Sequence, residues 1–210
     1  MKDLLEQEFA KGYGLTRKVP VSVNVYGGSF SLCDDKACNS CDSTHNQNCD
    51  KIVLHVKCET PIDVVDLEHF LDAFNDKISG KRCDLMMYDE SKIVLCELTC
   101  SKSHLIVPHK RKDVWVPGKR EYAYGQIDNT IRTLCHVALV HEAIKKRKKV
   151  ALFAYREKDF PIVDDFIGKI VQPMKDFNPL EASIAAMNLS TDMSEGFSFV
   201  QVRYPDAYLW

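Results

Sequence analysis

The stretch KRCDLMMYDESKIVLCELTC, residues 81–100, decides how the rest of the sequence is interpreted. Two short apolar runs are joined by the polar turn DESK at residues 89–92, which is the pattern of a β-hairpin. Each run carries an acid on what would otherwise be an apolar face: Asp84 opens the first and Glu97 lies late in the second. Because burying an unpaired charge is unfavourable, two carboxylates in a core hairpin need a physical explanation.

The register of this hairpin predicts that the two acids lie opposite each other. A turn at DESK pairs Tyr88 with Ile93, and counting outward places Asp84 opposite Glu97, with Thr99 on the same face. Cross-strand partners lie about 5 Å apart at Cβ, so two carboxylates there repel unless a cation or a shared proton lies between them. Mg²⁺ or Mn²⁺ held by carboxylates, a backbone carbonyl and water is one solution.

The surrounding segments predict a single α/β domain over residues 1–210. Alternating or continuous apolar residues indicate strands at 19–28, 51–59, 150–157 and 197–204. Helical spacing of apolar residues indicates helices at 2–12, 61–78, 121–146 and 162–176. We expect the first two strands to pair, with the cysteine-rich segment 30–50 as an insertion in their hairpin.

The run from Gly80 through Asp84 to Glu97 resembles the PD-(D/E)xK superfamily of metal-dependent nucleases, over residues 63–156. The resemblance implies a restriction-endonuclease-like core, in which helices flank a mixed sheet, and cleavage of DNA or RNA. It also implies a catalytic Mg²⁺ or Mn²⁺ bound by the two acids. Leu98 would lend its carbonyl, and Glu68, with Asp72 one turn further along, would be the acid on the preceding helix.

One departure from the family concerns its motif lysine, which is replaced here by Thr99. Lys102 or Lys119 would take the part of that lysine, and Gln126 would orient water or phosphate. An alternative is a catalytically inactive nuclease-like module that binds nucleic acid or protein.

A plainer alternative involves no metal at the two acids. In it, Asp84 pairs with Arg82 and Glu97 meets a lysine across the sheet.

A second candidate metal site lies in CDDKACNSCDSTHNQNC, residues 33–49, where cysteines occur at 33, 38, 41 and 49. Four thiols in so polar a segment predict a loop ordered by structural Zn²⁺, with ligands Cys33, Cys38, Cys41 and Cys49. An iron–sulfur cluster, which would suit a redox sensor, and free or disulfide-bonded thiols remain alternatives. The other cysteines lie in apolar contexts typical of small buried residues: Cys58, Cys83, Cys96, Cys100 and Cys135.

Residues 101–120 concentrate positive charge directly after the second acid-bearing run. Lysine and arginine side chains that we expect to contact phosphate are Lys102, Lys110, Arg111, Lys112, Lys119 and Arg120. Trp115 lies among them and suits stacking on a base or packing inward. A plain solvated loop is the alternative for this segment.

Composition limits the remaining possibilities. The 210 residues are 45% hydrophobic and 28% charged, with a net charge of −2, so attraction to nucleic acid must come from a local patch. No apolar run is long enough for a membrane span, and the charged start MKDLLEQEFAKGYG is not typical of a signal peptide. We therefore expect a cytoplasmic protein with reduced or metal-bound cysteines. The aromatic end SFVQVRYPDAYLW is expected to pack on the body or on a protein partner in a larger complex.

Overall fold

A mixed sheet organises the chain. The computed structural model describes residues 1–34, 51–158 and 191–210. The sheet is seven-stranded, in the order β1-β2-β3-β4-β7-β8, with β9 beside β2. Its strands are β1 (Val23–Cys33), β2 (Ile52–Asp66), β3 (Leu85–Tyr88), β4 (Lys92–Ser101), β7 (Lys148–Glu157), β8 (Ser198–Arg203) and β9 (Ala207–Leu209). Strands β1 to β4 are antiparallel neighbours, whereas β4, β7 and β8 run parallel, as β9 does to β2.

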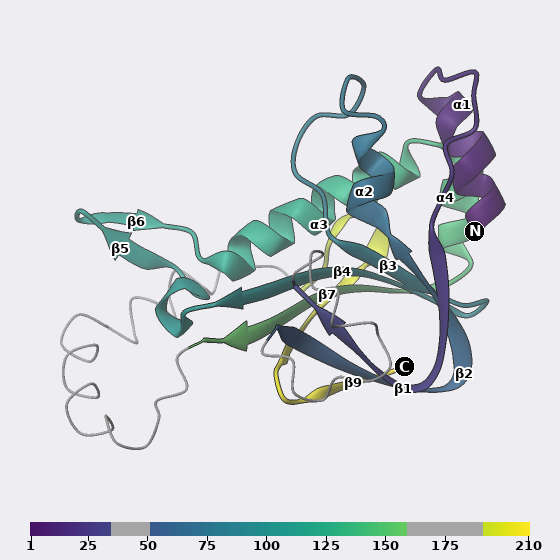
Figure 1. Cartoon of the computed structure of the whole chain (residues 1–210). Helices are drawn as coiled ribbons and strands as arrows, with labels where there is room; N and C mark the ends of the chain where they lie inside the picture. The colour runs from purple at the N-terminus through teal and green to yellow at the C-terminus, as the bar shows by residue number, and fades with distance from the viewer. Residues whose placement is uncertain (35–50, 159–190) are drawn as a thin grey trace.

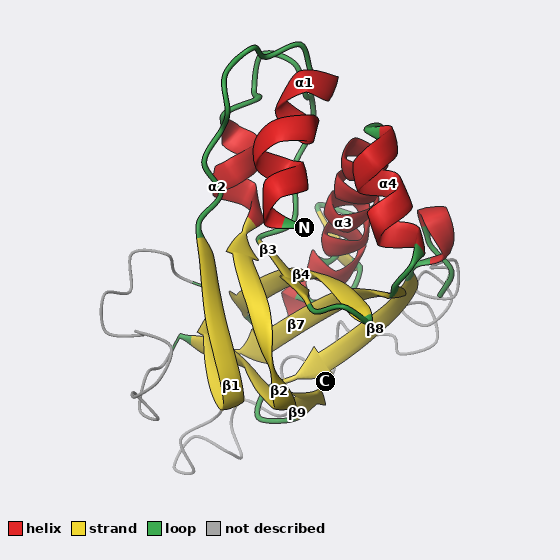
Figure 2. Cartoon of the chain, turned by 90° about the vertical axis from the view of Figure 1, so that its right-hand side faces the viewer, coloured by secondary structure: helices red, strands yellow, loops and turns green. Residues whose placement is uncertain are grey.

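Helices cover one face of this sheet (Figures 1 and 2). They are η1 (Leu4–Phe9), α1 (Ala10–Gly12), α2 (Leu67–Asp72), α3 (Lys119–Cys135) and α4 (Ala138–Lys145). Their apolar sides meet inward-facing strand residues in one buried cluster that includes Phe9, Leu67, Phe74, Ile127, Val140, Ile93, Leu95 and Phe153. The predicted α/β class, with helices flanking a mixed sheet, is therefore confirmed.

A bend in β2 lets the sheet curl, so that β1 and β9 lie below β4 and β7 in Figure 1. The pairing of β1 with β2 shifts between Tyr26 and Gly28, where residues 59–61 of β2 have no partner in the ladder. Gly28 has φ +75° there, a conformation that favours glycine. Beyond the bend, the same edge of β2 that carries β9 pairs with β3. One long strand thus lines both apolar clusters.

The hairpin at the centre of the sequence has the predicted register. Tyr88 pairs with Ile93 and Leu85 with Cys96, as the DESK turn requires. The helix expected over 61–78 begins later, because residues 61–66 complete β2 and only Leu67 starts α2. Val64 and Val65 pack into opposite apolar clusters, as neighbouring residues of a strand do. In the sequence alone, the same apolar pair also fits the spacing of a helix.

The single helix expected over 121–146 is also wrong, because it divides into α3 and α4. Val137 between them is extended, with φ −93° and ψ 112°. This link is buried against α1, where a Cβ on Gly12 would lie 2.5 Å from Val137 Cγ2. Tyr13 Oη also donates a hydrogen bond to the carbonyl of Thr133, at 2.9 Å. Tertiary packing by the N-terminal segment therefore accompanies a break that helix propensity does not indicate.

The segment between β4 and α3 is ordered into a projecting hairpin. It contains η2 (Ser103–Leu105), β5 (His109–Arg111) and β6 (Val114–Val116). Lys112 and Asp113 form its tip with φ 50° and 62°, a pair of left-handed residues that suits the twist of a two-residue hairpin. Figure 1 shows that this hairpin extends beyond the ends of β4 and β7. The helix expected at 162–176 and most of the cysteine-rich segment lie outside the described residues.

The C-terminal tryptophan packs on the body of the protein. Trp210 Nε1 donates a hydrogen bond to Asp89 Oδ2 at 2.6 Å, and the Lys92 ammonium lies 4.7 Å from the indole ring. Asp89 also accepts the backbone N–H groups of Ser91 and Lys92 in the turn of the central hairpin. The end of the chain is thereby fixed to the turn that sets the register of β3 and β4.

We expect Trp210→Phe to lower the free energy of unfolding by about 1–2 kcal/mol, because it removes a hydrogen bond to a carboxylate while keeping an aromatic ring. Urea unfolding followed by circular dichroism measures this change. The matched control is Trp115→Phe on the exposed hairpin, which should leave the free energy of unfolding within about 0.5 kcal/mol of wild type. Equal effects of the two substitutions would show that the Asp89 contact contributes nothing specific.

Candidate active site

Asp84 connects three elements at the start of β3. Its carbonyl oxygen accepts the N–H groups of Leu67 (2.9 Å) and Glu68 (3.2 Å), which open α2. Its carboxylate Oδ2 accepts the N–H of Leu98 in β4, at 2.8 Å. The first amides of a helix have no partner within the helix, so the Asp84 carbonyl satisfies two of them. This arrangement fixes α2 beside the hairpin and brings Glu68 close to the two motif acids.

Glu97 extends the apolar face of β4 into a polar environment. Ile93 and Leu95 on the same face are buried under the helices, and Glu97 is the next residue in this alternation. Its Oε1 accepts a hydrogen bond from Gln126 Nε2 at 2.9 Å. Its Oε2 is buried and accepts no hydrogen bond from any described residue. An orphaned buried oxygen on an acid is costly unless a cation or a proton accompanies it.

Gln126 is held by the segment that leads into β3. Its Nε2 donates a second hydrogen bond to the Arg82 carbonyl at 3.0 Å. Because a backbone carbonyl can only accept, this contact fixes the amide with its nitrogen toward Glu97. Asn129, one turn along α3, donates to the carbonyls of Ser79 (3.3 Å) and Lys81 (3.0 Å). Side chains of α3 thus donate hydrogen bonds to backbone carbonyls of the segment that precedes β3. One of these hydrogen bonds positions Gln126.

A further acid, Asp34, lies at this site and was missed by the sequence analysis. Its Oδ2 accepts the N–H of Cys100 in β4, at 2.6 Å. In the sequence Asp34 is one acid among several in the cysteine-rich segment, so it gives no distinct signal. Its position beside β4 depends on the pairing of β1 with β2, which ends at the preceding residue, Cys33. We call Asp34, Glu68, Asp84 and Glu97 the carboxylate cluster.

The cluster changes the acidity of its most buried member. Burial is the largest cause and the neighbouring carboxylates of Asp84, Glu68 and Asp34 add to it, whereas the Gln126 hydrogen bond opposes them; together they raise the pKa of Glu97 to about 9. We therefore expect Glu97 to carry a proton at neutral pH in the absence of a cation. A divalent cation fits this donor set, because hard carboxylate oxygens are the ligands that Mg²⁺ and Mn²⁺ prefer.

The plainer pairing of Asp84 with Arg82 is wrong. The Arg82 guanidinium instead donates from its Nη1 to Asp72 (3.1 Å) and Asn75 (2.6 Å). Asp72 is thereby neutralised by an arginine, which leaves Glu68 as the acid of α2 that acts on Glu97.

The residues expected to replace the motif lysine lie in different places. Thr99 is buried on the same face of β4 as Glu97 and pairs with Tyr155 of β7. Lys102 caps η2 and Lys119 begins α3; both are exposed, and neither ammonium group makes a hydrogen bond or ion pair with a described residue. Only Gln126, among the residues proposed to assist the acids, contacts Glu97 within the described ranges.

The cysteine predictions are tested only in part. Cys33 ends β1 opposite Ile52, whereas Cys38, Cys41 and Cys49 lie outside the described residues. The expected burial of Cys58, Cys83 and Cys96 is confirmed, but Cys100 and Cys135 are only half-buried.

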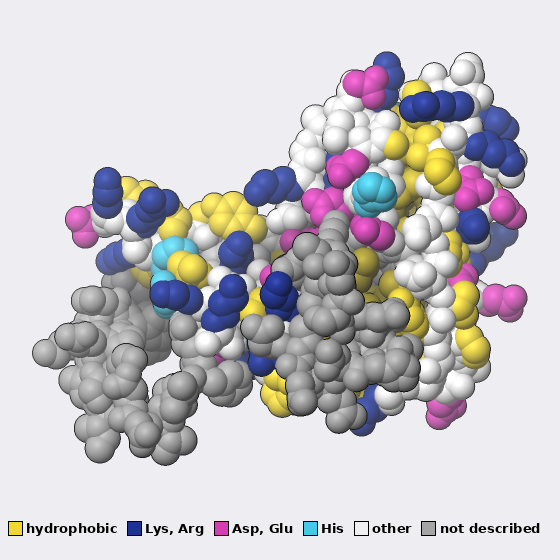
Figure 3. Space-filling view, in the orientation of Figure 1, with side chains coloured by type: hydrophobic (Ala, Val, Ile, Leu, Met, Phe, Trp, Pro, Cys, Tyr) yellow, Lys and Arg dark blue, Asp and Glu magenta, His cyan; other side chains and the backbone are white. Residues whose placement is uncertain are grey.

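The projecting hairpin carries three of the exposed basic residues of this segment. Lys110, Arg111 and Lys112 are exposed, and the Lys110 ammonium lies 5.4 Å from the centre of the Trp115 ring. We call residues 109–116 the basic hairpin; Figure 3 shows basic and apolar side chains interleaved there. Arg120 differs, because it is largely buried in an ion pair with Glu121.

Comparison with protein-family models finds no match for this chain. Comparisons with curated proteins and with solved structures likewise find none. Among the described helices, none is long and apolar enough to cross a membrane.

The raised pKa of Glu97 makes a prediction about stability. Between its usual value of 4.5 and about 9, the folded state binds a proton that the unfolded state releases. The free energy of unfolding therefore falls as pH rises through this range, by at most about 1.4 kcal/mol per pH unit from this group. We expect Glu97→Gln to flatten this dependence and to be more stable than wild type at pH 8 in chelator. Urea unfolding from pH 5 to 9 measures both effects.

The control is Glu90→Gln, which alters an exposed carboxylate in the turn of the same hairpin. It should follow the wild-type pH dependence. A Glu97→Gln variant that also follows it would show that Glu97 is ionised in the metal-free protein.

Proposed function

We propose that this chain is a metal-dependent nuclease of the PD-(D/E)xK type, with its restriction-endonuclease-like core at residues 63–156. The observation that carries the proposal is the buried Glu97 Oε2, which accepts no hydrogen bond from a described residue although three further carboxylates act on Glu97. The order of elements supports it as well: β2 and α2 precede the acid-bearing hairpin, and α3 and β7 follow it.

Asp84 and Glu97 would hold Mg²⁺ or Mn²⁺, with Glu68 and the Leu98 carbonyl as further ligands and Asp34 as an added acid. The bound cation would activate water and stabilise negative charge on a phosphoryl oxygen. The protein itself supplies the rigidity of the site. The hydrogen bond from Leu98 to Asp84 and the one from Gln126 to Glu97 each hold one carboxylate through one of its oxygens.

Gln126 is the residue that we assign to the position of the missing lysine. An amide cannot give up a proton as an ammonium group can, so its part is orientation of Glu97 and of a water beside it. Thr99 adds a hydroxyl on the same face of β4, whereas the exposed Lys102 and Lys119 suit contact with substrate phosphates.

We propose the basic hairpin as the nucleic-acid contact. It projects past the end of β4, the strand that carries Glu97 (Figure 1). Lys110, Arg111 and Lys112 suit phosphates, and Trp115, which is 41% exposed, suits stacking on an unpaired base.

The cysteine-rich loop has a structural part in this proposal. Zn²⁺ bound by Cys33, Cys38, Cys41 and Cys49 would clip the chain where β1 ends, next to Asp34. An iron–sulfur cluster on the same four thiols is the alternative, and visible colour would distinguish it.

We expect isothermal titration calorimetry to detect Mg²⁺ or Mn²⁺ binding by wild type, with affinity that rises with pH because the cation displaces the Glu97 proton. Asp84→Asn and Glu97→Gln should each weaken binding at least tenfold. Cleavage of single- and double-stranded DNA and RNA, measured in the same samples, should fall by at least a hundredfold in both.

Asp72→Asn provides the matched control, because that acid of α2 is already paired with Arg82. It should bind the cation as wild type does. Binding without cleavage in wild type would favour the inactive module acting in a larger complex. Wild type that binds neither cation would overturn the metal site.

For the basic hairpin, we expect the triple variant Lys110→Gln, Arg111→Gln and Lys112→Gln to weaken binding to every nucleic-acid sequence. It should also reduce the slope of log K against log salt on duplex DNA, by up to about 0.9 for each phosphate that the variant no longer neutralises. Fluorescence anisotropy with labelled oligonucleotides measures both. Lys145→Gln with Lys146→Gln, at the end of α4, removes exposed charge elsewhere and should leave the slope unchanged.

A further inference from the structure

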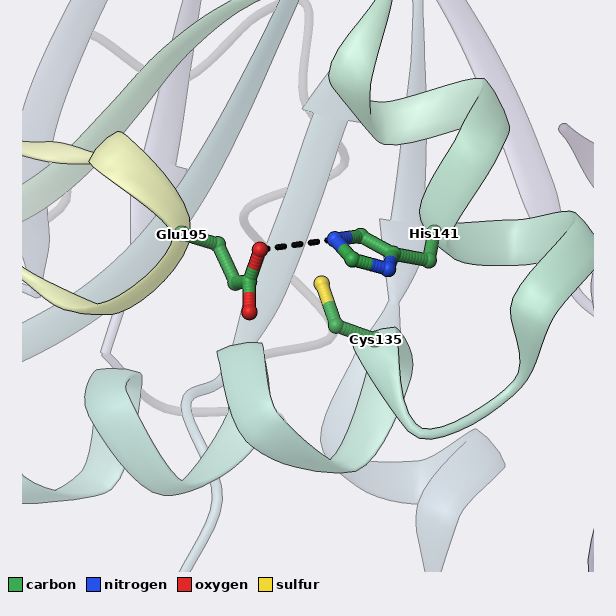
Figure 4. A group of neighbouring side chains, drawn as sticks. All are labelled: Cys135, His141 and Glu195. Atoms are coloured by element: carbon green, nitrogen blue, oxygen red, sulfur yellow. Dashed lines mark hydrogen bonds and ion pairs between the residues drawn. The ribbon is translucent and has the colours of Figure 1, made fainter.

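A second group of metal-ligating side chains lies apart from the carboxylate cluster. Cys135 at the end of α3, His141 in α4 and Glu195 in η4 (Ser194–Gly196) point toward one another (Figure 4). One ligand atom from each lies within 4.8 Å of the other two. His141 Nε2 and Glu195 Oε2 are 2.7 Å apart.

The break between α3 and α4 creates this group. In a continuous helix, residues six positions apart are turned by about 240° and would project to different sides. The extended Val137 interrupts the helix and changes the direction of the chain, and the His141 N–H then donates to the Val137 carbonyl at 2.9 Å as α4 begins. Cys135 and His141 thereby share one side of the helix pair.

Glu195 is held in place from the opposite direction. Its backbone has φ 58° and ψ 20°, a left-handed conformation that costs a non-glycine residue about 1 kcal/mol or more. Lys149 Nζ donates to its carbonyl at 2.6 Å, and the preceding Ser194 N–H donates to Asp128 Oδ1 at 3.3 Å. The loop therefore presents Glu195 to the helices from a fixed position just before β8.

An ion pair between His141 and Glu195 would account for their short contact but not for Cys135 beside both. Thiolate, imidazole and carboxylate together are ligands of Zn²⁺, whereas a thiolate is a poor ligand for Mg²⁺ or Ca²⁺. In a tetrahedral zinc site the ligand atoms lie about 3.3–3.7 Å apart, so the present spacing needs adjustments of about 1 Å.

We propose that Cys135, His141 and Glu195 form a Zn²⁺ site with three protein ligands. The fourth position faces solvent, since the His141 and Glu195 side chains are 21% and 40% exposed, and it would take water or an external ligand. A thiolate and a carboxylate neutralise the two charges of zinc, so the neighbouring Lys149 meets a site of no net charge.

This site is distinct from the carboxylate cluster. Gln126, which contacts Glu97, precedes Cys135 by nine residues along α3, or about 14 Å of helix. The zinc site would connect α3, α4 and the start of β8, whereas the carboxylate cluster connects β1, α2, β3 and β4.

Titration of the metal-free full-length protein with Co²⁺ tests the proposal, because a cobalt–thiolate bond absorbs in the near ultraviolet and tetrahedral cobalt absorbs in the visible. The cysteine-rich loop also offers thiols, so the readout is the difference between wild type and each variant. We expect His141→Ala and Cys135→Ser each to bind one equivalent fewer of Co²⁺ and of Zn²⁺. Added Zn²⁺ should raise the melting temperature of wild type more than that of either variant.

Glu195→Gln alters an exposed side chain, so it preserves the fold and should weaken binding of that equivalent at least tenfold. His136→Ala is the matched control, since this exposed histidine of the same link packs against Tyr13 instead, with the ring centres 5.3 Å apart and the rings tilted by 43°. It should retain the wild-type stoichiometry. Unchanged stoichiometry and affinity in Cys135→Ser, His141→Ala and Glu195→Gln would overturn the site, whatever the outcome for Mg²⁺ binding or cleavage.

Discussion

The backbone and side chain of Asp84 form the contact on which the arrangement of the carboxylate cluster depends. Its carbonyl satisfies two amides at the start of α2, and its carboxylate accepts an amide of β4. A helix end buried without partners would be unfavourable, so α2 takes its position from this residue. The same contacts place Glu68 near Glu97 and fix the Oδ2 atom of Asp84 on the Leu98 amide. Asp84 thus contributes to the geometry of the site through its hydrogen bonds and to its charge through its carboxylate.

That charge opposes folding unless something compensates it. Glu97 lies on a strand whose preceding inward residues, Ile93 and Leu95, are fully buried. From the described residues it gains one neutral hydrogen bond, donated by Gln126. Ordinary selection for stability would favour an apolar residue at this position. A buried acid in such surroundings is typical of a functional site. The burial and the neighbouring carboxylates that raise its pKa also favour binding of a cation in place of the proton. The instability and the proposed metal binding have one cause.

Sequence reasoning reached the parts of this protein that periodicity controls. The turn at residues 89–92 and an alternation of two predicted the register of β3 and β4, which pairs Tyr88 with Ile93 and Leu85 with Cys96. The helix predicted over 61–78 started too early because of Val64 and Val65, since a short apolar pair fits a helix as well as a strand that is buried on both sides. The presence of Asp34 at the site could not be predicted, since its position depends on how far β1 extends and on the bend in β2. Helix 162–176 stays a prediction.

The two candidate sites share a physical reason for being hard to predict in full. Four of their residues lie where elements begin, end or break: Asp34 after β1, Glu68 in the first turn of α2, Cys135 before the link at Val137, and Glu195 before β8. Propensity and hydrophobic pattern are weakest at such places, because the backbone there is set by tertiary contacts such as that of Gly12 with Val137. Polar side chains converge at these same places, because residues at the ends of helices and strands do not have to contribute to an apolar face that packs in the core. The sequence therefore predicts the frame that carries a site more completely than the site itself.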